Sequence, residues 1–323
     1  MYSISVILPY FINNNGHWPD YIDWFFASCK ANPTVDFFIF TDDESKLKYN
    51  VEKNIKVIKM TFAECAALVN EKLDGAVLTF PYKLCDYKPA YAVIFEDWVK
   101  DYDYYGFCDC DLMFGNIREF FPDSFLEKYD HFLLLGHFQL FKKENRYDYK
   151  LTWPINSKYK DGKTWAIVKE SEKNFGWDEW DGVPQLIREN GISIYWERKI
   201  FSNIYQPKKN GKHLYKKLID KNDGANRPFQ IWQWKNGGIY HINMITKKET
   251  PKLYIHFTER RLKFNSYEGQ REIYITENSE LKNRVSFKDS ICIWDWFRVI
   301  TKKIFIWIKW KLTHLRGKQP WEM

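Results

Sequence analysis

Two carboxylates stand one residue apart in the stretch GFCDCDLMFGN, residues 106–116. The apolar residues before Asp109 and Asp111 indicate a β-strand, in which positions i and i+2 point to the same side. We therefore expect both carboxylates on one face and Cys108 and Cys110 on the opposite, buried face. Two like charges this close repel each other unless a cation neutralises them, and oxygen ligands favour Mg²⁺ or Mn²⁺. The spacing predicts a divalent-metal site, with a solvated acidic turn as the alternative.

Strands and helices must alternate to position this pair. Continuous or alternating apolar runs predict strands at 3–9, 36–41, 54–60 and 104–114, and helical periodicity predicts helices at 21–30, 61–73 and 88–102. Such alternation is typical of an α/β fold with a mixed, mostly parallel sheet flanked by helices. Ligands bind these sheets at the carboxyl ends of the strands. The segments Pro9-Tyr10, Thr41-Asp42 and Cys108 to Asp111 should therefore converge on one edge.

The pattern is less regular further along the chain. One or two strands are expected at 131–143 around Gly136, with others at 192–197 and 252–257. We expect these strands to continue the same sheet.

Composition narrows the class of protein. The 323 residues are 45% hydrophobic and 28% charged, which is typical of a globular protein.

The six cysteines do not have the spacing of a zinc site. The first residues have the pattern of a strand and not of an export signal, so we expect reduced thiols in a cytoplasm. Much of the net charge of +7 lies after residue 290, which leaves the body nearly neutral and disfavours nucleic-acid binding.

The ordered motifs resemble the nucleotide-sugar-dependent glycosyltransferases of the GT-A type. More closely, the chain is similar to a largely uncharacterised family of bacterial polysaccharide-biosynthesis glycosyltransferases. The segments that carry the resemblance are VILPYF (6–11), FTDD (40–43), PYKLCDYKPAYAVIF (81–95), YGFCDCDLMFGNI (105–117), GHFQLFK (136–142), WDEW (177–180) and IHFTERR (255–261). The resemblance implies a GT-A fold, a nucleotide-diphosphate sugar as donor and a divalent metal ion, Mn²⁺ or Mg²⁺.

The resemblance also implies a ligand set. Asp109 and Asp111 would hold the metal and the diphosphate, and His256 would be the third protein ligand. Taken alone, His256 lies in an apolar strand, where a histidine is more often structural, but Arg260 and Arg261 beside it suit a diphosphate. Cys110 departs from the isoleucine or valine that family members usually carry between the aspartates.

Six further positions are candidates for the nucleotide site. By the resemblance, Pro9, Tyr10 and Asp42 look like the end that binds base and ribose, with turn formation as the alternative. Lys83, Asp86 and Lys88 open a helix before the aspartate pair. The lysines could meet phosphate, whereas Asp86 could simply cap the helix.

The box Trp177-Asp178-Glu179-Trp180 suggests the acceptor side of a transferase. A carboxylate can take the proton of an acceptor hydroxyl, so Glu179 or Asp178 is the candidate base. Trp177 and Trp180 would offer flat faces to sugar rings. The alternatives are an acidic surface loop and a retaining enzyme, which would need no such base. His137 follows the family pattern at a strand under the acceptor.

The last segment is basic and aromatic. Lys302 and Lys303 interrupt its apolar residues, so the run is too short to span a bilayer. On a helix, four of its charged residues form one narrow polar stripe, namely Asp295, Arg298, Lys302 and Lys309. This pattern predicts an amphipathic helix on an anionic membrane surface, or else a helix packed on the domain or a partner.

Together these features predict a catalytic domain over residues 1–285, with a nucleotide-binding half (1–118) and an acceptor half (119–285), followed by a tail (286–323). We expect a glycosyltransferase at the inner face of the cell membrane that acts on a lipid-linked or surface glycan. The alternatives are a non-catalytic glycan- or lipid-binding protein and another metal-dependent phosphoryl-transfer enzyme. The sequence leaves the oligomeric state open.

Overall fold

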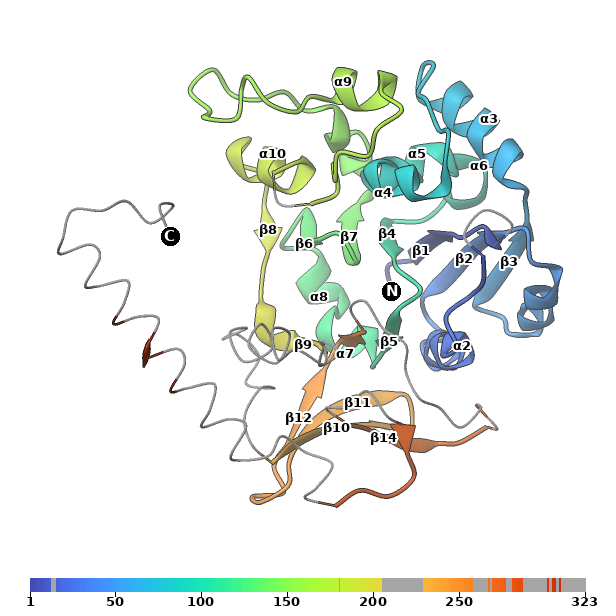
Figure 1. Cartoon of the computed structure of the whole chain (residues 1–323), viewed down its shortest axis with the longest axis vertical. Helices are drawn as coiled ribbons and strands as arrows, with labels where there is room; N and C mark the ends of the chain where they lie inside the picture. The colour runs from blue at the N-terminus through green and yellow to red at the C-terminus, as the bar shows by residue number, and fades with distance from the viewer. Residues whose placement is uncertain are drawn as a thin grey trace. The chain divides into compact units, whose positions relative to one another are not determined.

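The computed structural model divides into two compact units, Met1–Glu197 and Arg198–Met323. The structure describes residues 1–12, 16–179, 181–204, 229–257, 267, 269–276, 281–286, 301, 304–305 and 308 (Figure 1).

A seven-stranded sheet forms the centre of the first unit. In sheet order its strands are β3 (Ile55–Lys59), β2 (Asp36–Thr41), β1 (Ile4–Pro9), β4 (Tyr104–Cys108), β7 (Phe138–Lys142), β6 (His131–Leu135) and β8 (Ile194–Tyr195). The pairs β1–β2, β2–β3, β1–β4 and β6–β8 are parallel, whereas β4–β7 and β6–β7 are antiparallel. The predicted mixed, mostly parallel sheet is confirmed.

Helices cover both faces of this sheet. Those of the described part are α2 (Ile22–Lys30), α3 (Phe62–Lys72), α4 (Leu84–Tyr87), α5 (Tyr91–Ile94), α6 (Glu96–Val99), α7 (Ile117–Phe120), α8 (Asp123–Leu126), α9 (Trp165–Glu170) and α10 (Val183–Glu189) (Figure 1). Thr61 and Glu64 form a capping box at the start of α3. The single helix expected at 88–102 is instead broken into short pieces, and Phe95 at one break stacks on Phe40 with ring centroids 4.0 Å apart.

Alternate side chains of β2 fill the two layers of the core. Phe38 and Phe40 join the apolar cluster that includes the buried residues of α3, α5 and α6. Phe37 points to the other face, where its ring lies 5.6 Å from Phe114 of the short strand β5 (Leu112–Phe114). This alternation explains why a strand buried on both faces reads as a continuous apolar run.

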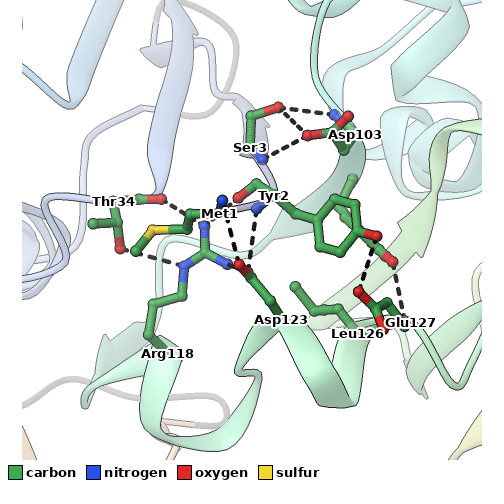
Figure 2. A network of polar contacts seen from close by, with 10 residues as sticks. Met1, Tyr2, Ser3, Thr34, Asp103, Arg118, Asp123, Leu126 and Glu127 are labelled. Atoms are coloured by element: carbon green, nitrogen blue, oxygen red, sulfur yellow. Dashed lines mark hydrogen bonds and ion pairs between the residues drawn. The ribbon is translucent and has the colours of Figure 1, made fainter.

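The amino end of β1 is held by a network of polar contacts, shown in Figure 2. Asp103 Oδ2 accepts hydrogen bonds from the Ser3 amide and hydroxyl, both at 2.8 Å. Arg118 donates to the carbonyl oxygen of Tyr2 and contacts Asp123, which also accepts from the Tyr2 amide at 3.2 Å. These contacts fix one end of the strand, and its carboxyl end lines the pocket described below.

The second unit has its own antiparallel sheet. In sheet order its strands are β12 (Glu249–Lys252), β11 (Gly238–Asn243), β10 (Gln230–Lys235), β14 (Glu272–Ile275) and β15 (Leu281–Lys282). Asn236 and Gly237 both have positive φ, 51° and 82°, as a two-residue hairpin between β10 and β11 requires. Beside this sheet, β9 (Phe201–Asn203) pairs in parallel with β13 (Tyr254–His256). The strands expected at 131–143 and 192–197 do continue the central sheet, as β7, β6 and β8, whereas the strand expected at 252–257 does not: β13 pairs with β9, outside the seven-stranded sheet.

Buried His241 should make the stability of the chain depend on pH. It lies opposite Trp232 in the β10–β11 pair, and burial, with help from the charge of Lys252, lowers its pKa to about 3. Between pH 6.5 and 3 the unfolded chain binds this proton and the folded chain does not, so stability falls as pH falls. From pH 7 to pH 5 the free energy of unfolding of the wild type should therefore fall by about 2 kcal/mol more than that of His241→Phe, which has no such group. Urea unfolding at pH 7 and pH 5 measures this difference. If both proteins lose the same free energy of unfolding, His241 is not the group responsible.

Most of the predicted tail helix lies outside the described residues. Of the described positions of the tail, Thr301, Ile304, Phe305 and Ile308 are helical and exposed, and Ser286 is exposed and not helical. Within the part of the chain that the structure describes, we find no helix with the length and apolar character needed to cross a membrane.

Candidate active site

A pocket of about 480 Å³ opens where β1 and β4 end in the first unit. Its volume lies in the range of small-molecule sites. Four segments supply its polar and aromatic lining: the end of β1, the turn after β4, the helical turn around Lys88, and the loop that includes Asp178. Residues in this lining are Pro9, Tyr10, Tyr82, Cys85, Lys88, Cys108, Asp109, Cys110, Asp111, Asn174, Gly176, Asp178 and Glu179.

The two aspartates lie in a turn and not on a continuous strand. β4 ends at Cys108 and β5 begins at Leu112, so the predicted strand 104–114 is wrong at its centre. The argument from strand alternation therefore does not apply, yet both aspartates line the pocket. The Asp109 amide donates to the carbonyl oxygen of His137 at 3.0 Å, which fixes the turn against the neighbouring strand.

The cysteines of this turn are unpaired and mostly buried. Cys108 is 1% exposed and Cys110 is 8% exposed. Burial raises the pKa of both thiols well above its usual value, so they stay protonated. Protonated thiols are poor ligands for a hard cation, so the carboxylates remain the candidate metal ligands of the turn.

Lys88 connects the turn that carries Asp109 and Asp111 (the aspartate turn) with the loop that carries Asp178 and Glu179 (the acidic loop). Its ammonium lies 2.7 Å from Asp109 Oδ1 and 3.2 Å from Asp178 Oδ2, and it donates to the carbonyl oxygen of Gly136 at 2.7 Å. Burial lowers the pKa of this lysine, but the nearby negative charges, Asp109 foremost, outweigh burial and raise it well above the usual value. Lys88 thus stays charged between the two carboxylates.

Asp178 and Glu179 differ in their surroundings although they are adjacent. Asp178 is 3% exposed, and burial raises its pKa to about 7 in spite of the opposing effect of Lys88. Glu179 is exposed and also lines the pocket. Both candidate bases therefore reach the pocket, one beside Lys88 and the other accessible to solvent.

Lys83 and Asp86 form an ion pair of 2.9 Å in which both side chains are fully buried. Asp86 also accepts hydrogen bonds from the amides of Phe175 and Trp177, at 2.9 Å or slightly longer. Lys83 donates in addition to the carbonyl oxygens of Val168 and Lys173. Neither side chain lines the pocket, so we do not include them in the proposed nucleotide site. They attach the acidic loop to α4.

Of the side chains predicted to bind the acceptor, those that the structure describes do not line the pocket. Trp177 is 0% exposed and belongs to the apolar core, so its faces cannot receive a sugar ring. This differs from the prediction: the amides of Phe175 and Trp177 donate to the buried carboxylate of Asp86, which holds this part of the loop in the interior. Trp180 lies outside the described residues. His137 is half-buried and is not part of the pocket lining, although its carbonyl oxygen holds the aspartate turn.

At the end of β1, Pro9 and Tyr10 line the pocket. The Tyr10 ring stacks on Trp18 with centroids 4.3 Å apart, and its hydroxyl donates to the carbonyl oxygen of His17 at 3.1 Å. Asp42 does not line the pocket; its carboxylate accepts from the Ile12 amide at 2.7 Å and so shapes the loop that follows Tyr10.

His256 lies on β13 of the second unit and is buried. Its Nδ1 is 2.9 Å from Asn203 Oδ1 on the paired strand β9. An amide oxygen only accepts, so Nδ1 carries the proton and Nε2 carries the lone pair that a metal ligand needs. Arg260 and Arg261 lie outside the described residues.

Tyr82, Asn174 and Gly136 are among the residues of this site that the sequence analysis did not predict. Tyr82 is 68% exposed and lines the pocket with Asn174, and Gly136 lies against the two acidic side chains. Tyr82 belongs to one of the family-like segments and could have been found there. No signal in the sequence marks Asn174, and Gly136 was visible only as a break between strands.

Several solved structures are similar to this chain. They include the galactosyltransferase LgtC in complex with donor and acceptor sugar analogues (9% identity, 79% of this chain and 87% of that chain, TM-score 0.39). They also include mouse xyloside xylosyltransferase 1 in its apo form (10% identity, 80% of this chain and 98% of that chain, TM-score 0.36). A third is the glycosyltransferase GlyE of Streptococcus pneumoniae TIGR4 (12% identity, 80% of this chain and 56% of that chain, TM-score 0.37). No curated protein matches the sequence.

A family model covers most of the sequence, from the first strand to the last described strand of the second unit. Its match extends over residues 6–284, and the family is described as one of unknown function, DUF6625. The chain belongs to this family.

Proposed function

We propose that this protein is a metal-dependent glycosyltransferase that uses a nucleotide-diphosphate sugar. The observation that carries the proposal is the pocket itself. At the carboxyl ends of two parallel strands, Asp109 and Asp111 line the same cavity as Asp178 and Glu179. Such an arrangement supplies oxygen ligands for a divalent ion at one place and a candidate base at another.

On the donor side, Asp109 and Asp111 fit a hard divalent cation because they offer carboxylate oxygens and the Asp109 side chain is one-third exposed. We propose His256 as a further ligand, since Asn203 fixes the tautomer with its lone pair on Nε2. Arg260 and Arg261 would bind the diphosphate. The bound ion, Mn²⁺ or Mg²⁺, would act as a Lewis acid on the leaving diphosphate.

On the acceptor side, we propose Glu179 as the base. It is exposed at the pocket, whereas Asp178 is buried and held by Lys88. The proton of an acceptor hydroxyl would pass to the Glu179 carboxylate as the hydroxyl oxygen attacks the anomeric carbon of the donor sugar, and the bond from that carbon to the diphosphate oxygen would break to release the nucleoside diphosphate. Asp178 would hold Lys88, and through it Asp109, in place.

A thermal-shift panel tests donor binding. We expect one nucleotide sugar among UDP-, GDP-, CDP- and dTDP-sugars to raise Tm by about 5 °C when Mn²⁺ is present, and by far less in EDTA. Stabilisation by free sugars without metal would instead favour a glycan-binding protein. If no nucleotide sugar stabilises the chain in a metal-dependent way, the proposed donor class is wrong.

The acceptor and the location in the cell belong to the same proposal. We propose a lipid-linked or cell-surface glycan as acceptor and a peripheral place at the inner face of the cell membrane. The support is the basic, aromatic sequence of residues 286–323. The full chain should sediment with vesicles that contain anionic lipid, and equal sedimentation of a chain without residues 286–323 would contradict the role of the tail.

A further inference from the structure

The turn Gly136–His137 joins β6 to β7 and lies beside the charged residues of the pocket. The carbonyl oxygen of Gly136 accepts from Lys88 at 2.7 Å. The next carbonyl oxygen, that of His137, accepts from the Asp109 amide at 3.0 Å. The backbone of one short turn therefore holds both the lysine and the loop of the proposed metal ligands.

Gly136 also leaves room for the acidic side chains. A Cβ atom at this position would lie 2.9 Å from Glu179 Oε1 and 3.0 Å from Asp178 Oδ2. These distances are shorter than a van der Waals contact of carbon with oxygen. Gly136 is buried and does not have positive φ, so its backbone would accept alanine. Space, and not backbone conformation, is the reason for glycine here.

The strand that leads into this turn is irregular. The pairing of β6 with β7 shifts by one residue between Phe132 and Leu135, and the buried Leu133 has a φ of 57°. A leucine rarely adopts this conformation, and bulges of this kind change the direction of a strand next to functional sites. The bulge therefore helps to place Gly136 next to the side chains of Asp178 and Glu179.

We infer that Gly136 is a positioning residue for the transfer reaction. The inference rests on the proposed function. Because position 136 has no side chain, the carboxylates of Asp178 and Glu179 can both lie next to the turn that holds Lys88 and Asp109. An added methyl group displaces the exposed Glu179 at little cost to the fold, whereas Asp178 is kept near its place by Lys88. The base is thus misplaced while the metal ligands stay where they are.

The variant Gly136→Ala tests the inference through a split between kcat and KM. We expect kcat for Mn²⁺-dependent release of nucleoside diphosphate to fall about 100-fold, as a displacement of about 1 Å can cause. KM for the nucleotide sugar and the Mn²⁺ dissociation constant should stay within about threefold of the wild type, and Tm within about 3 °C. Gly162→Ala is the matched control: Gly162 is exposed, lacks positive φ and lies outside the pocket lining, and its added Cβ would also make a close contact, 3.1 Å from the carbonyl oxygen of Tyr159.

The outcomes separate this inference from the proposed function. An active wild type with an equally active Gly136→Ala variant overturns the positioning role alone, as does a variant whose kcat, KM, Mn²⁺ affinity and Tm all collapse together. A wild type with no metal-dependent turnover overturns the proposed function, and the positioning role with it. A double variant tests the contact between the added methyl group and the Glu179 carboxylate. The loss of Tm that Gly136→Ala causes should largely disappear when Glu179→Ala is also present. If the Tm losses of the two variants simply add, the two positions are not in contact.

Discussion

Asp109→Asn should lower Mn²⁺-dependent turnover of the nucleotide sugar at least about 1000-fold, which corresponds to about 4 kcal/mol of transition-state stabilisation. The substitution keeps the size of the side chain and removes the charge that faces the pocket and Lys88. Lys88 retains Asp178 and the carbonyl oxygen of Gly136 as partners, so the fold should remain intact. Steady-state kinetics and a Mn²⁺ titration followed by electron paramagnetic resonance measure the two effects.

A matched substitution shows whether the loss is specific. Asp161→Asn removes one negative charge from an exposed position that is not part of the pocket lining, and it should leave turnover and Mn²⁺ affinity unchanged. If Asp109→Asn keeps Mn²⁺-dependent turnover within about threefold of the wild type, Asp109 does not hold the metal and the donor side of the proposal is wrong.

Asp86→Ala should cost about 4 kcal/mol of unfolding free energy, the largest stability effect that we expect in the first unit. The change leaves the ammonium of Lys83 without its counter-ion in a site where neither side chain has any solvent exposure. The amides of Phe175 and Trp177 lose their acceptor at the same time. Since these amides hold the acidic loop, the folded fraction should also lose activity. Urea unfolding followed by circular dichroism measures the stability.

Asp181→Ala is the natural comparison. Its ion pair with Lys163 has the same separation of 2.9 Å, but the two side chains are 57% and 26% exposed. Exposed pairs contribute little, so this variant should lose less than about 1 kcal/mol. Equal costs for Asp86→Ala and Asp181→Ala would mean that the buried pair does not fix the loop as we describe.

The local parts of the fold could be predicted from the sequence. Strand β2 matches its expected bounds, Asp36–Thr41, because a buried strand with turn residues at both ends carries its own signal. The capping box of Thr61 and Glu64 is equally local, since both partners lie within four residues. The break in the helix expected at 88–102 was not predictable in this way, because Phe95 packs on a strand more than fifty residues earlier.

The candidate site shows the same division. Ligands bind α/β sheets at the carboxyl ends of the strands, and Pro9, Tyr10, Asp109 and Asp111, which follow from this rule, all line the pocket, whereas Asp42, which follows from the same rule, does not. For Lys83 and Asp86, residue type and position predict a place near phosphate. Their true partners are the segments around Val168 and Phe175, about ninety residues further on, and no local pattern reveals such contacts.

The release of nucleoside diphosphate by the purified full-length chain tests the central claim most directly. A panel of nucleotide sugars is incubated with the protein and Mn²⁺, with and without a mixture of simple glycosides as acceptors, and again after addition of EDTA. We predict that one donor is turned over, that EDTA abolishes the release and that Mn²⁺ restores it. Turnover that persists in EDTA, or its absence with every donor, would contradict the assignment of this protein as a metal-dependent glycosyltransferase.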